Sequence, residues 1–469
     1  MTTTNAASTL FRFATAGSVD DGKSTLVGRL LHDSKAILAD QLESVARTSA
    51  ERGFGGEPGA IDFALLTDGL RAEREQGITI DVAYRYFSTG RRSFILADCP
   101  GHVQYTRNMV TGATTADAVV VLVDARKGVL EQTRRHLAVV QLLRVPHVIV
   151  AVNKIDLLGY DERAFTTVAT DVSALVREFG LPEAHVIPVS ALAGDNVVER
   201  SANTPWYDGP SLLELLETLP SLDELETELE ALRMPVQLVI RPQGAVASGV
   251  DDPERFRDYR AVAGRIASGT VRVGDAVQVF PGGATTTVTG IDAGPRELDE
   301  ASAPRSVSLR LADELDAARG AVIVAAGALP TPRRELDAAL FWLASTPLRP
   351  GARVLVKSGT STVQALVASI HGTRNLDSLA LEAADGLEVN DIGQATIRLA
   401  SELPVEEYAA HRRAGGFLVI DPQSGATLAA GIVTAPVTRT AGLADASTGT
   451  HAGISGTSTT TTDTEGAAA

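Results

Sequence analysis

Residues 1–220 of the 469-residue chain are predicted to form an α/β domain with a parallel-type sheet, followed by two all-β barrel domains. Up to residue 220, strand-like apolar runs alternate with helical patterns, which is typical of a parallel sheet with helices on both faces. From Met234 onward the apolar period changes to two, and Gly-Asp and Pro-Gly-Gly turns separate short runs, as in small barrels. The chain therefore combines two kinds of β architecture.

The individual elements follow from these patterns in order along the chain. In the α/β domain, strands are predicted at Phe11–Ala16, Phe94–Ala97, Ala118–Val123, Val148–Val152 and Val186–Val189. The helices predicted there are Ser24–Leu31, Glu131–Leu143, Glu162–Phe179 and Ser211–Leu219. Barrel strands are predicted at Val236–Ile240, Ala261–Ile266, Ala276–Phe280 and Thr287–Ile291, and then at Arg353–Lys357, Val363–Ile370, Gly393–Leu399 and Phe417–Ile420.

Changes in composition predict the domain boundaries. The first barrel is assigned to residues 234–330 and the second barrel to residues 331–436. The acidic run Leu222–Leu232 is predicted to be a linker between the α/β domain and the first barrel. Residues 437–469 are dominated by Thr, Ser, Ala and Gly without an apolar period, which predicts a disordered tail.

Composition and charge limit the classes of partner. The net charge of −16 disfavours a dominant electrostatic contact with nucleic acid or an anionic membrane. The longest apolar runs are far shorter than a membrane span, and Met1–Ser8 lacks the basic and apolar regions of a secretory signal. The single cysteine, Cys99, excludes an internal disulfide and is compatible with a reducing compartment. We therefore expect a cytoplasmic protein with no nucleic-acid or membrane partner.

Residues Gly17–Ser24 read Gly-Ser-Val-Asp-Asp-Gly-Lys-Ser and match the P-loop pattern. A loop that turns several backbone N–H groups toward a polyphosphate needs positions without a Cβ atom, which Gly17 and Gly22 provide. Lys23 supplies a positive charge, and Ser24 supplies a hydroxyl for Mg²⁺. The helix that follows would direct the positive end of its dipole at the anion. This stretch predicts a nucleotide-phosphate site.

A second acidic motif, Asp98-Cys-Pro-Gly-His102, follows the predicted strand Phe94–Ala97. Asp98 would hold Mg²⁺ through water, and the Gly101 amide could reach the γ-phosphate. His102 would then orient the attacking water. The motif therefore predicts a site that hydrolyses a nucleoside triphosphate.

The loop that ends in Glu75-Gln-Gly-Ile-Thr-Ile80 precedes this motif. Thr79 could give its hydroxyl or carbonyl oxygen to Mg²⁺ only when the γ-phosphate is present, so this loop is predicted to be a nucleotide-dependent switch. The predicted Mg²⁺ ligands are then Ser24, Thr79 and Asp98.

Two further loops predict the base. Asn153-Lys-Ile-Asp156 follows the strand Val148–Val152, and Ser190-Ala-Leu192 follows the next strand. Asp156 can accept hydrogen bonds from the guanine N1–H and exocyclic amine, whereas adenine would leave it unpaired, a discrimination of ~10⁴. Asn153 is predicted to bind N7 and tie loops together, and the Ala191 amide is predicted to donate to the guanine O6.

The ordered motifs resemble those of the translation-factor class of GTPases, and two barrels behind a P-loop GTPase domain resemble their layout. Within that class, longer stretches are similar to the large, GTP-binding subunits (CysN) of two-subunit sulfate adenylyltransferases. These stretches are Gly17–Leu26, Leu31–Lys35, Asp68–Asp81 and Asp98–Met109. Elongation factors typically carry His at the positions of Ser18 and Asp21. The resemblance is close over residues 10–200 and looser in the barrels.

This resemblance implies a GTPase with GTP and Mg²⁺ as cofactors. It also implies a heterodimer with a small, CysD-like catalytic subunit, which joins sulfate to the AMP moiety of ATP and releases pyrophosphate. GTP turnover would drive that uphill step through a population shift, because the γ-phosphate orders Val45–Thr79 and the segment after His102. The implied catalytic residues are Lys23, Thr79 and His102. The implied GTP-binding residues are Gly17, Ser18, Val19, Asp20, Asp21, Gly22, Lys23, Ser24, Thr25, Asp98, Cys99, Pro100, Gly101, His102, Asn153, Lys154, Ile155, Asp156, Ser190, Ala191 and Leu192.

Several stretches depart from that pattern. Gln243–Asp258 is longer than the family's connection between the first barrel strands, and the chain stops where some relatives continue into an adenylyl-sulfate kinase domain. Gly351–Ser358 matches the P-loop pattern except at Val356, and its alternation predicts a strand. Asp20 and Asp21 are expected to face solvent, with a cation site at Asp20 as an alternative. Cys99 is expected to be a packing residue.

Two other functions remain open from the sequence. A translation-type GTPase would deliver or bind RNA on its barrels, and its mark would be a basic, aromatic-bearing barrel surface. The barrels carry scattered arginines and no basic tail follows them. A scaffold with a degenerate GTPase site is disfavoured by the complete motif set.

Overall fold

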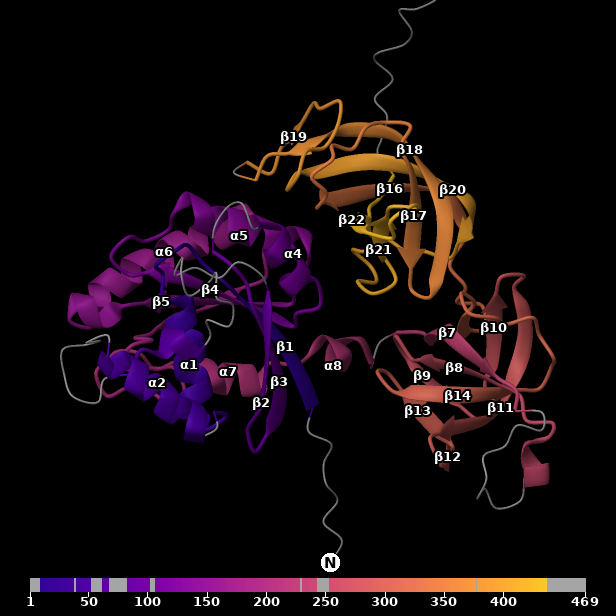
Figure 1. The fold of residues 1–469 in the computed structure, drawn as a ribbon, viewed down its shortest axis with the longest axis horizontal. Helices are drawn as coiled ribbons and strands as arrows, with labels where there is room; N and C mark the ends of the chain where they lie inside the picture. The colour runs from indigo at the N-terminus through magenta and orange to yellow at the C-terminus, as the bar shows by residue number, and fades with distance from the viewer. Residues whose placement is uncertain are drawn as a thin grey trace, which may run out of the picture. The chain divides into compact units, whose positions relative to one another are not determined.

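One mixed sheet and two barrels organise the part of the chain that the computed structural model describes (Figure 1). This part comprises residues 9–37, 39–51, 61–66, 82–101, 106–227, 230–242, 253–376 and 378–436. Residues up to Ala435 belong to one compact unit. The predicted α/β domain with a parallel-type sheet and two following barrels is confirmed.

The mixed sheet of the α/β domain has the strand order β2-β3-β1-β4-β5-β6. Its strands are β1 (Thr9–Ala16), β2 (Ala83–Ser88), β3 (Arg92–Asp98), β4 (Ala118–Asp124), β5 (His147–Asn153) and β6 (Ala184–Pro188). All neighbours are parallel except the edge strand β2, which runs antiparallel to β3. The register pairs Thr15 with Asp98 and Asp124 with Asn153. The carboxyl ends of these strands therefore meet at one edge, where ligands of such sheets bind.

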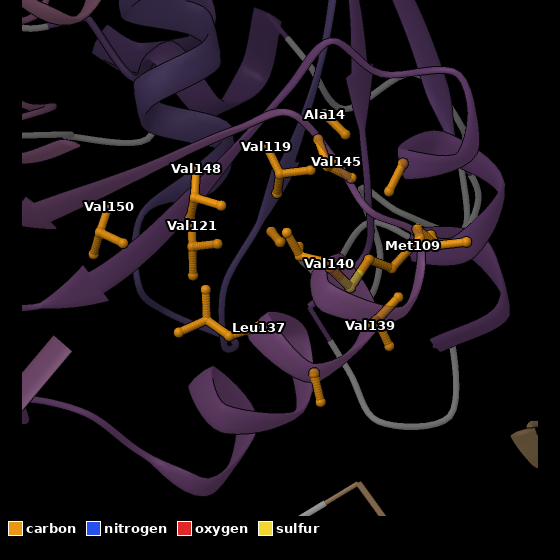
Figure 2. Packing of buried hydrophobic residues seen from close by; sticks show 14 of the residues in the cluster. Ala14, Met109, Val119, Val121, Leu137, Val139, Val140, Val145, Val148 and Val150 are labelled. Atoms are coloured by element: carbon orange, nitrogen blue, oxygen red, sulfur yellow. The ribbon is translucent and has the colours of Figure 1, made fainter. Parts of the chain in front are cut away.

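Helices cover both faces of this sheet. They are α1 (Lys23–Asp33), α2 (Ala39–Glu51), α4 (Thr106–Thr114), α5 (Glu131–Leu142), α6 (Glu162–Glu178) and α7 (Leu212–Thr218). Helices α1 and α7 share a core with Leu122, whereas α4, α5 and α6 share a core with Val119 and Val121. Figure 2 shows Leu137 and Val140 of α5 beside Val121. Every residue of β4 is buried because both faces are covered, which explains its uninterrupted apolar run.

The first barrel closes through pairing of its end strands β10 and β11, in the order β10-β15-β7-β8-β14-β11. The strands of this part are β7 (Arg233–Ile240), β8 (Ala261–Arg265), β9 (Thr270–Arg272), β10 (Ala276–Phe280), β11 (Ala284–Ala293), β12 (Arg296–Leu298), β13 (Glu300–Ser302), β14 (Ser306–Leu311) and β15 (Val322–Ala325). Alternate residues of β10 are buried, as the period of two predicts.

The second barrel closes through β17 and β18, in the order β17-β21-β22-β16-β20-β18. Its strands are β16 (Arg333–Trp342), β17 (Arg353–Ser358), β18 (Ser361–Arg374), β19 (Leu381–Glu382), β20 (Ile392–Leu403), β21 (Gly416–Ile420) and β22 (Thr427–Val433). The stretch Gly351–Ser358, which imitates a P-loop in sequence, contributes β17. That strand pairs with β18 and β21, so its predicted structural role is confirmed.

Helix α8 (Leu222–Thr227) forms the first half of the predicted linker Leu222–Leu232. Ser221 caps this helix: its amide donates to the Glu224 carboxylate at 2.6 Å, and the Glu224 amide donates to its hydroxyl at 3.3 Å. Glu224 also accepts a hydrogen bond from Arg92 at 3.0 Å. The acidic residues therefore anchor a helix through contacts that the local pattern does not reveal.

Three helical turns complete the description: η1 (Phe63–Leu66), η3 (Ile155–Leu158) and η4 (Pro253–Phe256). The predicted tail 437–469 and most of the Gln243–Asp258 stretch lie outside the described residues. The predicted domain boundaries stay predictions. No helix among the described residues is long and apolar enough to cross a membrane.

The stability of the α/β domain should fall as the pH is lowered, because His136 of α5 is buried. Burial and the charge of Lys23 lower the pKa of His136 to about 3. Below about pH 6.5 the unfolded chain binds a proton that the folded chain does not bind. We expect this imidazole to cost at most about 1.4 kcal/mol per pH unit between about pH 6.5 and about pH 3.

Urea unfolding at several pH values, from about 7.5 down to about 5, measures this dependence. In His136→Gln the free energy of unfolding should decline less steeply with falling pH than in the unaltered chain. Equal slopes for the two proteins would contradict the assignment to His136.

Candidate functional site

The P-loop connects β1 to α1, and its two glycines adopt backbone angles that other residues avoid. Gly17 has φ 151° and Gly22 has φ 93°. A Cβ atom on Gly22 would lie 2.4 Å from Nδ2 of Asn153, and one on Gly17 would lie 3.0 Å from the Leu122 carbonyl oxygen. The loop therefore needs glycine at both positions, for conformation and for space.

Lys23 is the buried cation of this loop. Its Nζ donates to the carbonyl oxygens of Gly17 at 2.9 Å and Ser18 at 2.8 Å. Burial lowers the pKa of Lys23, and the nearby carboxylates of Asp98 and Asp21 oppose that shift. The ammonium also lies against Gly101, where a Cβ atom would be 2.3 Å from Nζ. The P-loop and the Asp98–Gly101 loop thus converge on Lys23.

Asp98 ends β3 and is held by the neighbouring strand. The Thr15 hydroxyl donates to Asp98 Oδ1 at 2.8 Å, and both side chains are buried. The next residue, Cys99, is fully buried in the core shared with Met109, and burial raises the pKa of its thiol. Cys99 therefore packs as predicted, while the carboxylate of Asp98 has a fixed orientation.

The structure separates Asp20 from Asp21. Asp20 is exposed as predicted, but the solvent-facing position predicted for Asp21 is wrong because its side chain is 1% exposed. Asp21 Oδ2 accepts the backbone N–H of Ser18 at 2.6 Å, so the carboxylate folds back and closes the loop. Burial raises its pKa. Asp21 Oδ1 and Ser18 Oγ are buried with no hydrogen-bond partner among the described residues.

Asn153, at the end of β5, ties two loops together. Its Nδ2 donates to the Asp21 carbonyl oxygen at 2.7 Å, and its Oδ1 accepts the Ala191 N–H at 2.9 Å. The predicted tying role is therefore present in the geometry. The Ala191 amide is occupied by Asn153, so its predicted contact with a guanine O6 stays a prediction. Ser190 is buried, and its hydroxyl accepts the Ala193 N–H at 3.1 Å.

Asp156 lies in η3, directly after β5. Its side chain is half-buried, and its carboxylate accepts no hydrogen bond from the described residues. Lys154 precedes it with φ 64° and extends its Nζ back to the carbonyl oxygen of Asp20. Ile155 between them is fully buried and anchors the turn. The acceptor predicted to read a base is thus fixed beside the P-loop by its neighbours.

Two family models match the chain. The elongation factor Tu GTP binding domain matches residues 8–226, and the GTP-eEF1A C-terminal domain-like family matches residues 335–434. The first match covers the mixed sheet with all the loops described above, and the second covers the second barrel.

Curated relatives extend the match over nearly the whole chain. The sulfate adenylyltransferase subunit 1 of Methylorubrum populi is 47% identical over 439 residues, which are 94% of this chain and 90% of that protein. This chain belongs to the sulfate adenylyltransferase subunit 1 family. The bifunctional enzyme CysN/CysC of Mycobacterium tuberculosis is also 47% identical, over 91% of this chain and 67% of its own length. The bifunctional enzyme NodQ of Rhizobium meliloti is 43% identical over 92% of this chain and 64% of its own length.

In this member of the sulfate adenylyltransferase subunit 1 family, Asp124 is a site residue that the sequence analysis missed. It ends β4 and is buried beside the P-loop and η3. Its carboxylate binds Arg126 at 2.7 Å and Lys154 at 3.0 Å. Although burial opposes it, hydrogen bonding to these two cations holds the pKa of Asp124 well below its usual range. The sequence could have indicated this role, because Asp124 is an acidic residue at the carboxyl end of β4. That strand lies between β1 and β5, which both precede predicted nucleotide loops.

Of the remaining predicted residues, some lie in the described part of the chain and others lie outside it. Ser24 and Thr25 are half-buried in the first turn of α1, while Val19 and Leu192 are exposed around the loops. Pro100 is buried next to Cys99. Thr79 and His102 lie outside the described residues. Of the predicted switch segment Val45–Thr79, the described part contains the end of α2 and η1, so its start is helical.

Replacing Gly101 with alanine should weaken guanine-nucleotide binding in this family member. The new Cβ atom would lie 2.4 Å from the Gly17 carbonyl oxygen and 2.3 Å from Lys23 Nζ. Lys23 can retreat, but the P-loop backbone must shift, a strain of about 1–3 kcal/mol that corresponds to about a 5- to 150-fold loss of GDP affinity.

Gly90→Ala is the matched control, because no atom lies within 4 Å of a Cβ atom at that position. Calorimetric titration with GDP measures both variants. Unchanged GDP affinity in Gly101→Ala would mean that the Asp98–Gly101 loop does not press on the P-loop.

Proposed function

We propose that this chain is the GTP-hydrolysing subunit of a heteromeric ATP sulfurylase. It couples GTP hydrolysis to the formation of adenosine 5'-phosphosulfate and pyrophosphate from ATP and sulfate, in cytoplasmic sulfate assimilation and cysteine biosynthesis. A separate small, CysD-like subunit carries out the adenylyl transfer. The observation that carries the proposal is that the phosphate, acidic and base-reading loops converge at one sheet edge, in a chain of the sulfate adenylyltransferase subunit 1 family.

The residues at this edge fit a nucleoside triphosphate with Mg²⁺. The buried ammonium of Lys23 and the buried atoms Asp21 Oδ1 and Ser18 Oγ, which lack hydrogen-bond partners among the described residues, are features of a site for a polar ligand. Lys23 would neutralise the phosphates, and Ser24 and Asp98, with Thr79, would hold the metal. Bound Mg²⁺ would stabilise charge on the phosphate oxygens.

Hydrolysis needs a positioned water, and His102 is the residue proposed to orient it. Its neighbour Gly101 lies against the P-loop, which supports this role. Thr79 is proposed to sense the γ-phosphate from the loop that precedes β2 in the chain. Loss of the γ-phosphate would then release both segments.

Coupling to the partner requires that a change at the nucleotide reaches another surface. Helix α4 follows the Asp98–Gly101 loop, and its far end contacts the second barrel. Arg412 Nη1 donates to the Ala116 carbonyl oxygen at 3.0 Å, and Nη2 donates to that of Ala113 at 3.0 Å. A displacement of α4 would therefore be felt by the second barrel. The small subunit must bind the two resulting states with different affinity for free energy to pass.

The base specificity of the site can be tested at Asp156. Asp156→Asn should shift preference from guanine to xanthine nucleotides, because the amide can donate to the carbonyl group that xanthine carries in place of the guanine amine. Loss of GDP affinity should be on the order of 10²-fold or more. Competition binding of GDP and xanthosine diphosphate measures the change.

Asp171→Asn, on the exposed face of α6, is the charge-matched control and should leave GDP binding unchanged. Retained guanine selectivity in Asp156→Asn would mean that the base pocket lies elsewhere.

The reaction itself is tested by co-expressing the chain with a small subunit encoded in the same operon. Sulfate-dependent pyrophosphate release from ATP should rise when GTP is added. With Lys23→Ala the stimulation should disappear while the complex still forms, because the change affects the phosphate loop and not the partner surface.

Pyrophosphate release that is indifferent to GTP would contradict the proposed coupling. Copurification of tRNA in place of a small subunit would instead favour a translation-type GTPase.

A further inference from the structure

A cavity of about 390 Å³ lies away from the nucleotide loops, among the mixed sheet and both barrels. Its cationic side chains come from every part: Arg12 from β1, Arg265 from β8, Lys357 from β17, and Arg412 and Arg413 from the segment before β21. Asp117 is the acidic side chain in its described lining. The lining therefore carries five cations and one carboxyl group.

Three of these cations share one further carboxylate, that of Asp223 in α8. Arg12 Nη1 lies 3.8 Å and Arg265 Nη2 lies 3.7 Å from Asp223 Oδ2, while Arg413 donates to Oδ1. The three guanidinium groups therefore share this one carboxylate. Burial lowers the pKa of Arg265, and the charges of Arg413 and Arg12 also act against protonation, which agrees with mutual crowding.

The other charged groups at the cavity are Lys357, Asp117 and Arg412. Lys357 is half-buried, and its ammonium group makes no hydrogen bond or ion pair with the described residues. The two carboxylate oxygens of Asp117 accept hydrogen bonds from the backbone N–H groups of Arg12 at 2.6 Å and Leu222 at 2.8 Å. Burial raises the pKa of Asp117, which favours its neutral form. The Arg412 guanidinium is buried against backbone carbonyl groups of the α4 end.

We propose that this cavity binds a multiply charged oxyanion of the phosphate class, held by Arg12, Arg265 and Lys357. The volume falls in the range of about 300–1,000 Å³ of small-molecule sites. Its apolar wall, which includes the buried Phe341 and Phe417, excludes water and strengthens charge–charge attraction. Guanidinium groups bind such oxyanions in bidentate geometry, which a monovalent halide cannot match.

A ligand here would join three parts of the chain, because its partners come from the mixed sheet and from both barrels. It would offset repulsion among Arg12, Arg265 and Arg413, which share the Asp223 carboxylate. The inference does not rest on GTP hydrolysis, since none of the residues that hold the ligand belongs to the nucleotide loops. The cavity can fail to bind an oxyanion while the proposed function is correct, and the proposed function can be wrong while the cavity binds an oxyanion.

The test uses the full chain saturated with GDP and Mg²⁺, so that the P-loop is occupied. Sulfate, inorganic phosphate, pyrophosphate and AMP are titrated at constant ionic strength against sodium chloride, by calorimetry and thermal unfolding. We expect saturable binding and a raised Tm with the multivalent oxyanions and none with chloride. The order among the four identifies inorganic anion or nucleotide as the source. The same response should persist in a Lys23→Ala background.

Lys357→Gln and Arg265→Gln should each weaken the binding ~10-fold, the scale of one charge-assisted hydrogen bond. Arg398→Gln is the matched control, because Arg398 pairs with Glu335 at 3.1 Å elsewhere on the second barrel. Asp223→Asn removes the internal competitor and should tighten binding. Folding of each variant is verified by unchanged GDP affinity.

Two results would overturn the proposal. One is the absence of saturable binding in the unaltered chain. The other is equal affinity in Lys357→Gln, Arg265→Gln and Arg398→Gln, which would place the anion outside this cavity.

Discussion

The buried side-chain amide of Asn153 is the contact on which the nucleotide edge depends. Its Nδ2 donates to the Asp21 carbonyl oxygen and its Oδ1 accepts the Ala191 N–H, so it fixes the spacing of the phosphate and base-reading loops. Replacing it would leave a buried donor and a buried acceptor unpaired, at about 1–3 kcal/mol each. The parallel register brings the phosphate, acidic and base-reading loops to one edge of the sheet. Asn153 then fixes the distance between the phosphate loop and the base-reading loop. The position of the strands in the sheet and the hydrogen bonds of Asn153 therefore together determine the arrangement of these loops.

Several charged side chains are gathered at this edge, and they are shielded from water. Lys23, Asp21, Asp98 and Asp124 are all buried, a condition that proteins tolerate when each group has a partner. Asp98 has Thr15, Asp124 has its two cations, and Lys23 has two carbonyl oxygens rather than a carboxylate. Burial is the main cause of the lowered pKa of Lys23. A phosphate bound at the P-loop would give this buried ammonium an additional anionic partner.

Periodicity was sufficient to predict the architecture. The uninterrupted apolar run of β4 indicated burial on both faces, and the alternation in β10 and β17 indicated barrels. Features that depend on distant partners were not predictable. The burial of Asp21 follows from a loop conformation that turns its carboxylate onto Ser18, and the pairing of Asp124 with Lys154 joins two strand ends. The helical form of α8 within the predicted linker was not predicted, because its acidic residues pair with arginines elsewhere in the chain.

The contact of Arg412 with the end of α4 limits how the domains can respond to nucleotide. Its guanidinium is buried and is bonded to the carbonyl oxygens of Ala113 and Ala116 and to the Tyr408 hydroxyl. If α4 moved alone, a buried charge would lose its acceptors, at a cost of several kcal/mol. Moving the second barrel with α4 avoids that cost. The buried guanidinium of Arg412, whose described partners are backbone carbonyl oxygens and the Tyr408 hydroxyl, thus ties this barrel to the helix that follows the acidic loop. A change begun at Gly101 therefore has a mechanical reason to extend beyond the α/β domain.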